Sequence, residues 1–356
     1  MSHDSKITQA LQKSNLDAFL VQKGCNLQYL TGFTGGEGLA VILSSGDCSL
    51  LVDGRYTYQA RTQSYPQINV LEYHHKTLWE TLNQLMLNCK RIGLESETPL
   101  NLYQRLQEKI SPKEWIHQAD FFEQIRIIKT SDEIEKLKKA ANIANEAYLA
   151  ILSQIREGVS ELELSGLLEY EMKKRGGQKV SFDVIVASGE RSAMPHGVAT
   201  EKKISAGDII TFDFGVFYQG YVSDTTRTVC LGKPLDPEAE KIYGIVLDAQ
   251  LKAIEAVKEN VTCSAIDALA RSHIEEKGYG ALFKHSTGHG IGLEIHELPR
   301  ISSECSIMLQ EGMAITVEPG IYIDHRFGIR IEDSLIVTKN GYINLTSLEK
   351  NKLQIL

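Results

Sequence analysis

The sequence predicts two domains, a small α/β domain over residues 1–125 and a larger α+β domain over residues 126–356 that is built from two related halves. Three observations support this prediction. The chain has 356 residues, which is long for a single hydrophobic core. Strand and helix signals alternate in the first third, and a nine-residue pattern in the second part recurs 105 residues later.

Composition narrows the class of protein. Hydrophobic residues make up 42% and charged residues 24% of the chain, as in soluble globular proteins. The formal net charge of −8 argues against a general nucleic-acid binder, which would carry a basic surplus. The apolar runs are too short to span a bilayer, the N-terminus has no apolar signal core, and the six cysteines form no CxxC pair. We therefore expect a cytoplasmic protein with reduced thiols that binds neither nucleic acid nor membrane.

The first domain is predicted from short elements of alternating type. Residues 18–22, 39–43 and 49–53 have the apolar character of strands, and residues 77–88 have the pattern of a helix. The glycine-rich segment 31–38 lacks the spacing of a phosphate-binding loop. We interpret it as a flexible turn, with a substrate-facing loop as the alternative.

Helix-start signals open the second domain. Thr130 and Glu133 form a capping box, and the apolar residues that follow recur every three or four positions, which predicts a helix over residues 130–158. Ser160 and Glu163 repeat the capping box at the start of the next helix. The boundary between the two domains is therefore expected shortly before Thr130.

The second half of this domain repeats the same order of elements. Asp236 and Pro237 predict the N-cap and first residue of a long helix, and residues 264–277 predict another. The segment "GMAITVEPG" at 312–320 then aligns without a gap on "GDIITFDFG" at 207–215. Both contain a threonine, an acid and a glycine at alternate positions, which predicts a duplicated, pseudo-symmetric domain.

Each half carries two acidic residues on either side of a turn. A turn near residues 218–220 would bring Asp213 next to Asp224, and a longer loop would do the same for Glu318 and Glu332. Burying four carboxylates together is costly, because each like-charge pair at about 4 Å costs on the order of 4 kcal/mol at an effective dielectric near 20. Either their pKa values rise or cations lie between them, and two divalent ions would balance the four charges.

A histidine-rich segment is the second indication of a metal site. The stretch "HSTGHGIGLEIHE" at 285–297 contains His285, His289 and His296 among glycines that allow close backbone approach. Imidazole is a good ligand for zinc, manganese or cobalt ions. A single histidine is more often a core residue, but three together beside the acid pairs favour a metal site. His196 in "MPHGV" is a fourth, weaker candidate.

With these motifs, the sequence resembles the metal-dependent Xaa-Pro peptidases, the prolidase and aminopeptidase P group. The histidine-rich segment matches the stretch around that family's metal-binding histidine, and the arginine in "FGIRIED" at 327–333 resembles the family's pattern. The resemblance covers nearly the whole chain. It implies a pita-bread catalytic domain with a pseudo-two-fold internal repeat, preceded by an α/β N-terminal domain, and it implies a homodimer.

The resemblance also implies the metal ligands. Asp213 would chelate one of two divalent ions, Asp224 and Glu332 would bridge both, and His289 and Glu318 would bind the other. Ligation rich in carboxylates favours manganese, with cobalt and zinc as alternatives.

Catalytic roles would fall to residues around these ligands. By the same resemblance, Glu318 would relay a proton from the attacking water, while His196 and His296 would stabilise the oxyanion and the leaving proline. His285 and Arg330 would bind substrate or support the ligands. The guanidinium is expected to hold a carboxylate, either that of a substrate or that of a ligand acid.

The resulting prediction is a dinuclear-metal hydrolase that cleaves the Xaa-Pro bond at the N-terminus of dipeptides or short peptides. We favour an Xaa-Pro dipeptidase because the chain is compact, with an Xaa-Pro aminopeptidase as the alternative. A creatinase-like hydrolase without metals and a non-catalytic pita-bread peptide-binding protein are weaker alternatives. Both would be expected to lack some of the five ligands, and all five are present.

Overall fold

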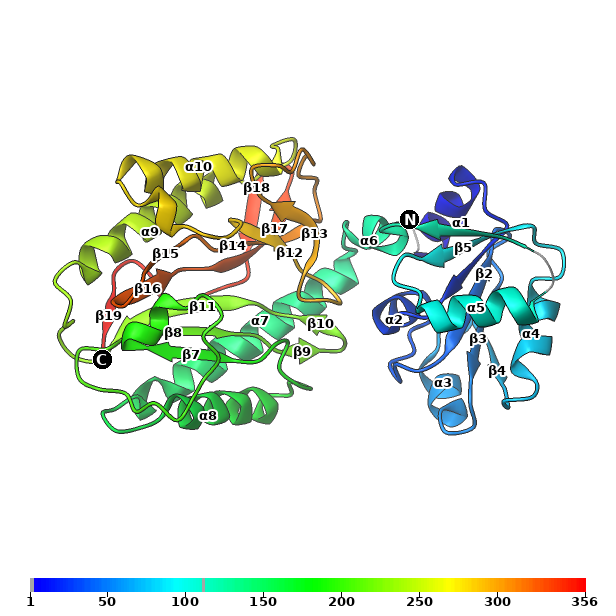
Figure 1. Cartoon of the computed structure of the whole chain (residues 1–356), viewed down its shortest axis with the longest axis horizontal. Helices are drawn as coiled ribbons and strands as arrows, with labels where there is room; N and C mark the ends of the chain where they lie inside the picture. The colour runs from blue at the N-terminus through cyan, green and yellow to red at the C-terminus, as the bar shows by residue number, and fades with distance from the viewer. Residues whose placement is uncertain (1–2, 111–112) are drawn as a thin grey trace. The chain divides into compact units, whose positions relative to one another are not determined.

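The computed structural model describes residues 3–110 and 113–356. The chain divides into two compact units, Met1–Arg126 and Ile127–Leu356 (Figure 1). Among the described residues, no helix combines the length and the apolar character needed to cross a bilayer.

The first unit is a mixed six-stranded sheet with helices. Its helices are α1 (His3–Lys13), α2 (Gly24–Thr31), α3 (Thr57–Gln63), α4 (Leu78–Leu85), α5 (Leu100–Lys109) and α6 (Phe121–Arg126). Its strands are β1 (Ala18–Val21), β2 (Leu39–Leu43), β3 (Cys48–Val52), β4 (Asn69–Glu72), β5 (Arg91–Glu95) and β6 (Glu114–Gln118). The strand order is β4-β3-β2-β1-β5-β6, and apolar residues of the central strands pack against α4 and α5.

The predicted strands of this unit are confirmed to within one residue at each end. The helix predicted over 77–88 is shorter, Leu78–Leu85, and α2 was not predicted. The glycine-rich segment begins at the end of α2, where Gly32 has a left-handed φ of 81° and caps the helix. Its remaining residues, 33–38, lie outside any helix or strand.

The second unit contains two similar halves. Its helices are α7 (Ser131–Ile151), α8 (Glu161–Lys174), α9 (Ala239–Glu255) and α10 (Cys263–Glu276), with 3₁₀ turns η1 (Leu152–Gln154), η2 (Gly189–Ala193) and η3 (Gly280–Leu282). Its first strands are β7 (Ile185–Ser188), β8 (Ile209–Phe214), β9 (Phe217–Tyr218), β10 (Tyr221–Val222) and β11 (Thr225–Cys230). The later strands are β12 (Gly288–Gly290), β13 (Glu297–Ile301), β14 (Ala314–Val317), β15 (Gly320–Ile323), β16 (Phe327–Arg330), β17 (Asp333–Thr338), β18 (Gly341–Asn344) and β19 (Gln354–Ile355).

Each half packs its own helix pair on its own sheet. Helices α7 and α8 cover the sheet β19-β11-β8-β7, while α9 and α10 cover the sheet β13-β12-β14-β17-β18 (Figure 1). The aligned segments are structurally equivalent, because Gly207 and Gly312 precede β8 and β14 with φ values of 86° and 88°. Residues with a side chain rarely adopt this conformation, so both glycines are required there. The predicted duplicated α+β domain is confirmed.

The predicted end of the first long helix is wrong. Helix α7 ends at Ile151 and continues as the 3₁₀ turn η1, whereas Gly158 was expected to end it. The apolar pattern extends past the helix because Ile155, although extended, still packs in the core formed by α7 and α8. The apolar spacing beyond Ile151 therefore reflects burial of Ile155 and not a continuing helix.

The predicted start of α9 is also wrong. The helix begins at Ala239, and Asp236 is not its N-cap. One carboxylate oxygen of Asp236 accepts a hydrogen bond from the backbone N–H of Glu238 at 3.0 Å, and both oxygens accept hydrogen bonds from Arg326. The aspartate therefore closes a turn before the helix and forms an ion pair on the surface.

A buried ion network joins the sheets of the two halves. Arg227 on β11 donates to Asp333 on β17 at 2.8 Å and to the backbone carbonyl of Leu348 at 2.9 Å. Asp333 is fully buried and also pairs with Lys350 and accepts from Asn344. Burial opposes its ionisation, but the charges of Arg227 and Lys350 hold the pKa of Asp333 below its usual value.

Removing the carboxylate of this network should destabilise the protein strongly. In metal-free Asp333→Ala, Arg227 and Lys350 lose the anion that compensates their burial, and breaking a buried pair costs about 3–5 kcal/mol. Thermal and urea unfolding would measure the loss. The control is Asp132→Ala, whose exposed ion pair with Lys136 should contribute less than about 1 kcal/mol. Equal unfolding midpoints for the two variants would contradict this account.

Candidate metal centre

Two hairpins bring the four acidic residues together. In the first half, β8 carries Asp213 and pairs antiparallel with β11, which begins directly after Asp224, so that Asp213 lies opposite Thr226. In the second half, Glu318 directly follows β14 and Glu332 directly precedes β17. The short hairpins β9–β10 and β15–β16 turn the chain between each pair, as the sequence predicted.

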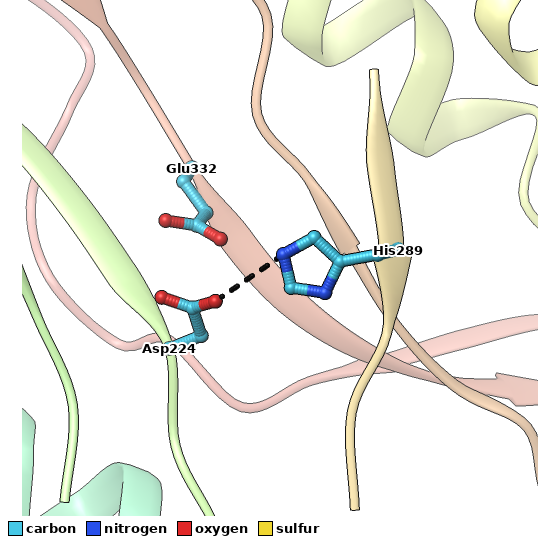
Figure 2. Close-up of side chains that lie close together, drawn as sticks. All are labelled: Asp224, His289 and Glu332. Carbon is cyan, nitrogen blue, oxygen red and sulfur yellow. Dashed lines mark ion pairs between the residues drawn. The ribbon is translucent and has the colours of Figure 1, made fainter. Parts of the chain in front are cut away.

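The side chains converge on His289 from β12. One ligand atom each from Asp224, His289 and Glu332 lies within 4.8 Å of the others (Figure 2). The Nε2 atom of His289 is 3.5 Å from Oδ2 of Asp224 and 3.3 Å from Oε1 of Glu318. Its Nδ1 atom lies 3.1 Å from the carbonyl oxygen of Gly290. A proton on Nδ1 would be donated to that carbonyl, which leaves Nε2 to face the acids.

Arg330 binds Asp213, the remaining acidic residue of the group. Its Nη2 donates to Oδ2 of Asp213 at 2.6 Å, and its Nε donates to Oγ1 of Thr226 at 3.1 Å. The Thr226 hydroxyl in turn donates to Oε2 of Glu332 at 2.8 Å. The sequence left open whether this guanidinium holds a substrate carboxylate or a ligand acid. In the structure it holds the ligand acid Asp213.

The carboxylate oxygens that bind neither Arg330 nor Thr226 have the properties expected of metal ligands. Among the described residues, Oδ1 of Asp213 and Oε1 of Glu332 are buried without a hydrogen-bond partner. Burial and the neighbouring carboxylates raise the pKa of Asp224 and of Glu332 well above their usual values. Buried acceptors without donors are rare and costly. A set of four carboxylates and one imidazole fits divalent cations such as manganese.

Glu318 behaves differently from the other acids. Burial opposes its ionisation, but the hydrogen bond and the charge of His289 lower the pKa of Glu318 to about 2. The same contact raises the pKa of His289 against the effect of burial. The Thr316 hydroxyl donates to Oε1 of Glu318 at 3.3 Å, and the backbone N–H of Glu318 donates to Thr287 at 2.7 Å. Glu318 therefore differs from Asp213, Asp224 and Glu332, because its pKa is lowered whereas theirs are raised.

His285 lies at one end of a hydrogen-bond chain that starts at Arg330. Nη1 of Arg330 donates to the hydroxyl of Tyr322 at 2.7 Å, and that hydroxyl lies 2.9 Å from Nε2 of His285. Nδ1 of His285 is 2.8 Å from the carbonyl oxygen of Ser286. This geometry favours a proton on Nδ1 and a hydrogen bond from Tyr322 to Nε2. Burial lowers the pKa of His285, which keeps the ring neutral.

The two remaining candidate histidines, His196 and His296, are exposed. The ring of His296 meets that of His289 edge to face at a centroid distance of 4.5 Å. Burial and the charge of His289 lower the pKa of His296. His196 is exposed in the segment after η2, and the carbonyl of the preceding Pro195 accepts a hydrogen bond from Arg330 at 3.1 Å. The structure thus places His196 beside the residue that holds Asp213.

Sequence reasoning missed Thr226 and Arg300, and for Tyr322 it favoured packing over a place in the proline pocket. Thr226 and Tyr322 link Arg330 to Glu332 and His285. Arg300 on β13 lies directly opposite His289 on β12. Directly paired residues of neighbouring strands project from the same face, so the exposed Arg300 side chain shares a face with His289.

Comparisons with known proteins agree with this geometry. Residues 135–339 match the model of metallopeptidase family M24, and residues 5–128 match that of the creatinase/prolidase N-terminal domain. An Xaa-Pro dipeptidase of Pyrococcus horikoshii is 41% identical over 345 residues, which cover 97% of each chain.

Solved structures show the same likeness. An Xaa-Pro dipeptidase from Bacillus anthracis is 42% identical with a TM-score of 0.95 over 99% of each chain. An X-Pro aminopeptidase from Thermotoga maritima is 39% identical with a TM-score of 0.91 over 100% of each chain. These findings confirm the family resemblance and the pita-bread fold that it implied, and the chain belongs to metallopeptidase family M24.

Proposed function

We propose that this metallopeptidase hydrolyses Xaa-Pro dipeptides with two divalent ions held by Asp213, Asp224, His289, Glu318 and Glu332. The observation that carries the proposal is the group of buried carboxylates whose pKa values are raised and two of whose oxygens have no donor among the described residues. Bound cations would remove both costs. The similar proteins named Xaa-Pro dipeptidase support the substrate class.

The chemistry divides between the ions and the chain. Bound divalent ions polarise a carbonyl group and lower the pKa of water. Glu318, buried with its Oε1 3.3 Å from Nε2 of His289, is proposed to take the proton of the attacking water and pass it to the leaving nitrogen. His196 and His296 at the rim are proposed to donate N–H groups to the oxygen on which negative charge develops. Neutral imidazoles suit this role, and the pKa of His296 is lowered.

The choice between dipeptidase and aminopeptidase depends on a cation for the proline carboxylate. Arg330 is already bound to Asp213, Tyr322 and a backbone carbonyl, so it supports the ligands and is not free to bind substrate. Arg300 is exposed on the same face as His289 and is proposed to hold the carboxylate of a dipeptide. The likeness to an X-Pro aminopeptidase keeps that activity as the second candidate.

The remaining properties extend the same proposal. We propose manganese as the metal because the ligand set is rich in carboxylates, with cobalt and zinc as alternatives. We also propose that residues 1–125 and 126–356 are the two domains, that the protein is a cytoplasmic homodimer, and that it binds neither nucleic acid nor membrane. Metal analysis of purified protein and analytical ultracentrifugation test the metal and the dimer.

The function is tested by comparing two substrates with added manganese. We expect two manganese ions per chain, cleavage of Ala-Pro well above that of Ala-Pro-Ala, and loss of activity on chelation that manganese restores. Asp224→Ala and Glu332→Ala should bind less manganese and lose activity by at least about 10-fold to 100-fold. A preference for Ala-Pro-Ala would identify an aminopeptidase, and unchanged activity in both variants would reject the metal centre as drawn.

Arg300→Met should separate the two peptidase classes. If the guanidinium holds the proline carboxylate, kcat/KM for Ala-Pro falls about 10-fold to 100-fold, mainly through KM, because a hydrogen bond to a charged group contributes about 1.5–3 kcal/mol. Ala-Pro amide, which lacks the carboxylate, should be cleaved equally by variant and wild type. The control is Arg156→Met, at an exposed site in the same unit. An equal loss on both substrates would reject this role.

Glu332→Gln should stabilise the metal-free protein as pH rises. The raised pKa means that the folded protein keeps a proton that the unfolded chain releases above the ordinary value of 4.5. The unfolding free energy of the wild type therefore falls as pH rises through the raised pKa, and the amide removes that loss. We expect the variant to melt higher at pH 8 by at least about 2 °C, with little difference near pH 4.

Manganese should reverse this order at pH 8, because only the wild type keeps the full ligand set. Melting curves with and without manganese give both comparisons. A metal-free variant that melts below the wild type at pH 8 would contradict the account of the buried acids.

A further inference from the structure

Two buried acids outside the metal centre, one in each half, are each paired with a half-buried arginine. Glu161 lies in the first turn of α8 and Asp267 in the second turn of α10, and both side chains have 0% exposure. Helices α8 and α10 are the second helices of their halves. Burying a carboxylate costs free energy unless it is paired and fully hydrogen-bonded, so the partners of each acid decide what it does.

The first pair holds both ends of the segment that carries His196. Oε1 of Glu161 accepts from the backbone N–H and the hydroxyl of Ser188, both at 2.8 Å. Oε2 accepts from the backbone N–H of Thr200 at 3.0 Å and from its hydroxyl at 2.8 Å. Arg191 pairs with the same carboxylate and donates to the carbonyl of Val198 at 2.8 Å.

The second pair holds the segment that carries His285 and leads to His289. Oδ1 of Asp267 accepts from the hydroxyl of Thr287 at 2.7 Å and from its backbone N–H at 3.3 Å. Arg271 forms an ion pair with Asp267 at 2.8 Å and donates to the carbonyl of His285 at 2.9 Å. In both pairs the acid binds a Ser or Thr N–H and hydroxyl, and the arginine binds a carbonyl of the same segment.

We propose that Glu161 with Arg191 and Asp267 with Arg271 are positioning pairs, each of which fixes a histidine of its own half. The first pair sets His196 and the second sets His289, and the inference rests on the proposed function for the role of His196. His196 is exposed on a segment that, apart from η2, has no helix or strand, so its position depends on how the backbone of this segment is held. A misplacement of about 1 Å in such a group can cost about 100-fold in rate.

Conservative variants of the two acids should change different properties of the enzyme. In Glu161→Gln, one of the oxygens becomes an NH₂ group, which cannot accept from Ser188 or Thr200. We expect kcat on Ala-Pro to fall about 10-fold to 100-fold with little change in KM, and manganese affinity to stay within about 2-fold. Asp267→Asn should instead weaken manganese binding about 10-fold to 100-fold, because Thr287 lies two residues from His289.

Glu163→Gln is the matched control. This glutamate lies two residues further along α8, its side chain is 58% exposed, and glutamine also suits its place in the capping box. Its kcat, its KM and its manganese affinity should stay within about 2-fold of wild type.

Hydrogen exchange of the metal-free proteins tests the pairs without any activity. We expect faster exchange at residues 188–200 in Glu161→Gln and at residues 283–289 in Asp267→Asn, each without change in the other segment. If Glu161→Gln does not fold, Thr200→Val removes one of the same hydrogen bonds and should show a smaller effect in the same segment.

The outcomes separate this inference from the proposed function. Local exchange that changes as expected in a protein that does not cleave Ala-Pro would support the pairs and reject the function. Exchange in Glu161→Gln that matches Glu163→Gln, or an equal loss of manganese binding in Glu161→Gln and Asp267→Asn, would reject the pairs.

Discussion

The structure of the second unit depends on the cost of enclosing four carboxylates in one place. Like charges at about 4 Å repel by several kcal/mol even at an effective dielectric near 20, and burial adds a desolvation cost. The chain itself offers two cations to offset them, the guanidinium of Arg330 at Asp213 and the imidazole of His289 at Glu318. The acids that remain, Asp224 and Glu332, are those whose pKa values are raised most.

The duplicated fold explains how such a group is assembled. Each half supplies a hairpin with one acid before it and one after it, and antiparallel pairing places those acids at the same end of the sheet. His289 lies on the short strand β12, whereas His196, His285 and His296 lie outside helices and strands, so their positions depend on contacts from elsewhere. Buried acids on α8 and α10 provide that support through the Ser and Thr residues of these segments. Regular structure thus positions the acids, while side-chain hydrogen bonds position the histidines.

Much of this architecture was predictable because its signals are local. Both capping boxes, at Thr130 with Glu133 and at Ser160 with Glu163, form as predicted, since a cap needs only residues three positions apart. The repeat and its two hairpins followed from glycines and acids in matching order.

The error at the start of α9 comes from a partner distant in sequence. Asp236 resembles an N-cap but binds Arg326, ninety residues away. The burial of Glu161 against Ser188 and Thr200 was not predicted either, because the local sequence does not show these partners. The carboxylate held by Arg330 remained undecided for the same reason, because a spacing does not show which of two acids a guanidinium reaches.

Charge balance shows what bound metal ions would contribute to this centre. With Arg330 and a protonated His289 beside four carboxylates, two further positive charges would be needed for neutrality, and protons or metal ions could supply them. This agrees with the raised pKa values of Asp224 and Glu332 and with the lowered pKa of Glu318. Divalent cations held by these carboxylates and by His289 would take the place of such protons, so metal binding would release protons. The buried carboxylates that destabilise the metal-free protein would therefore also favour the binding of cations.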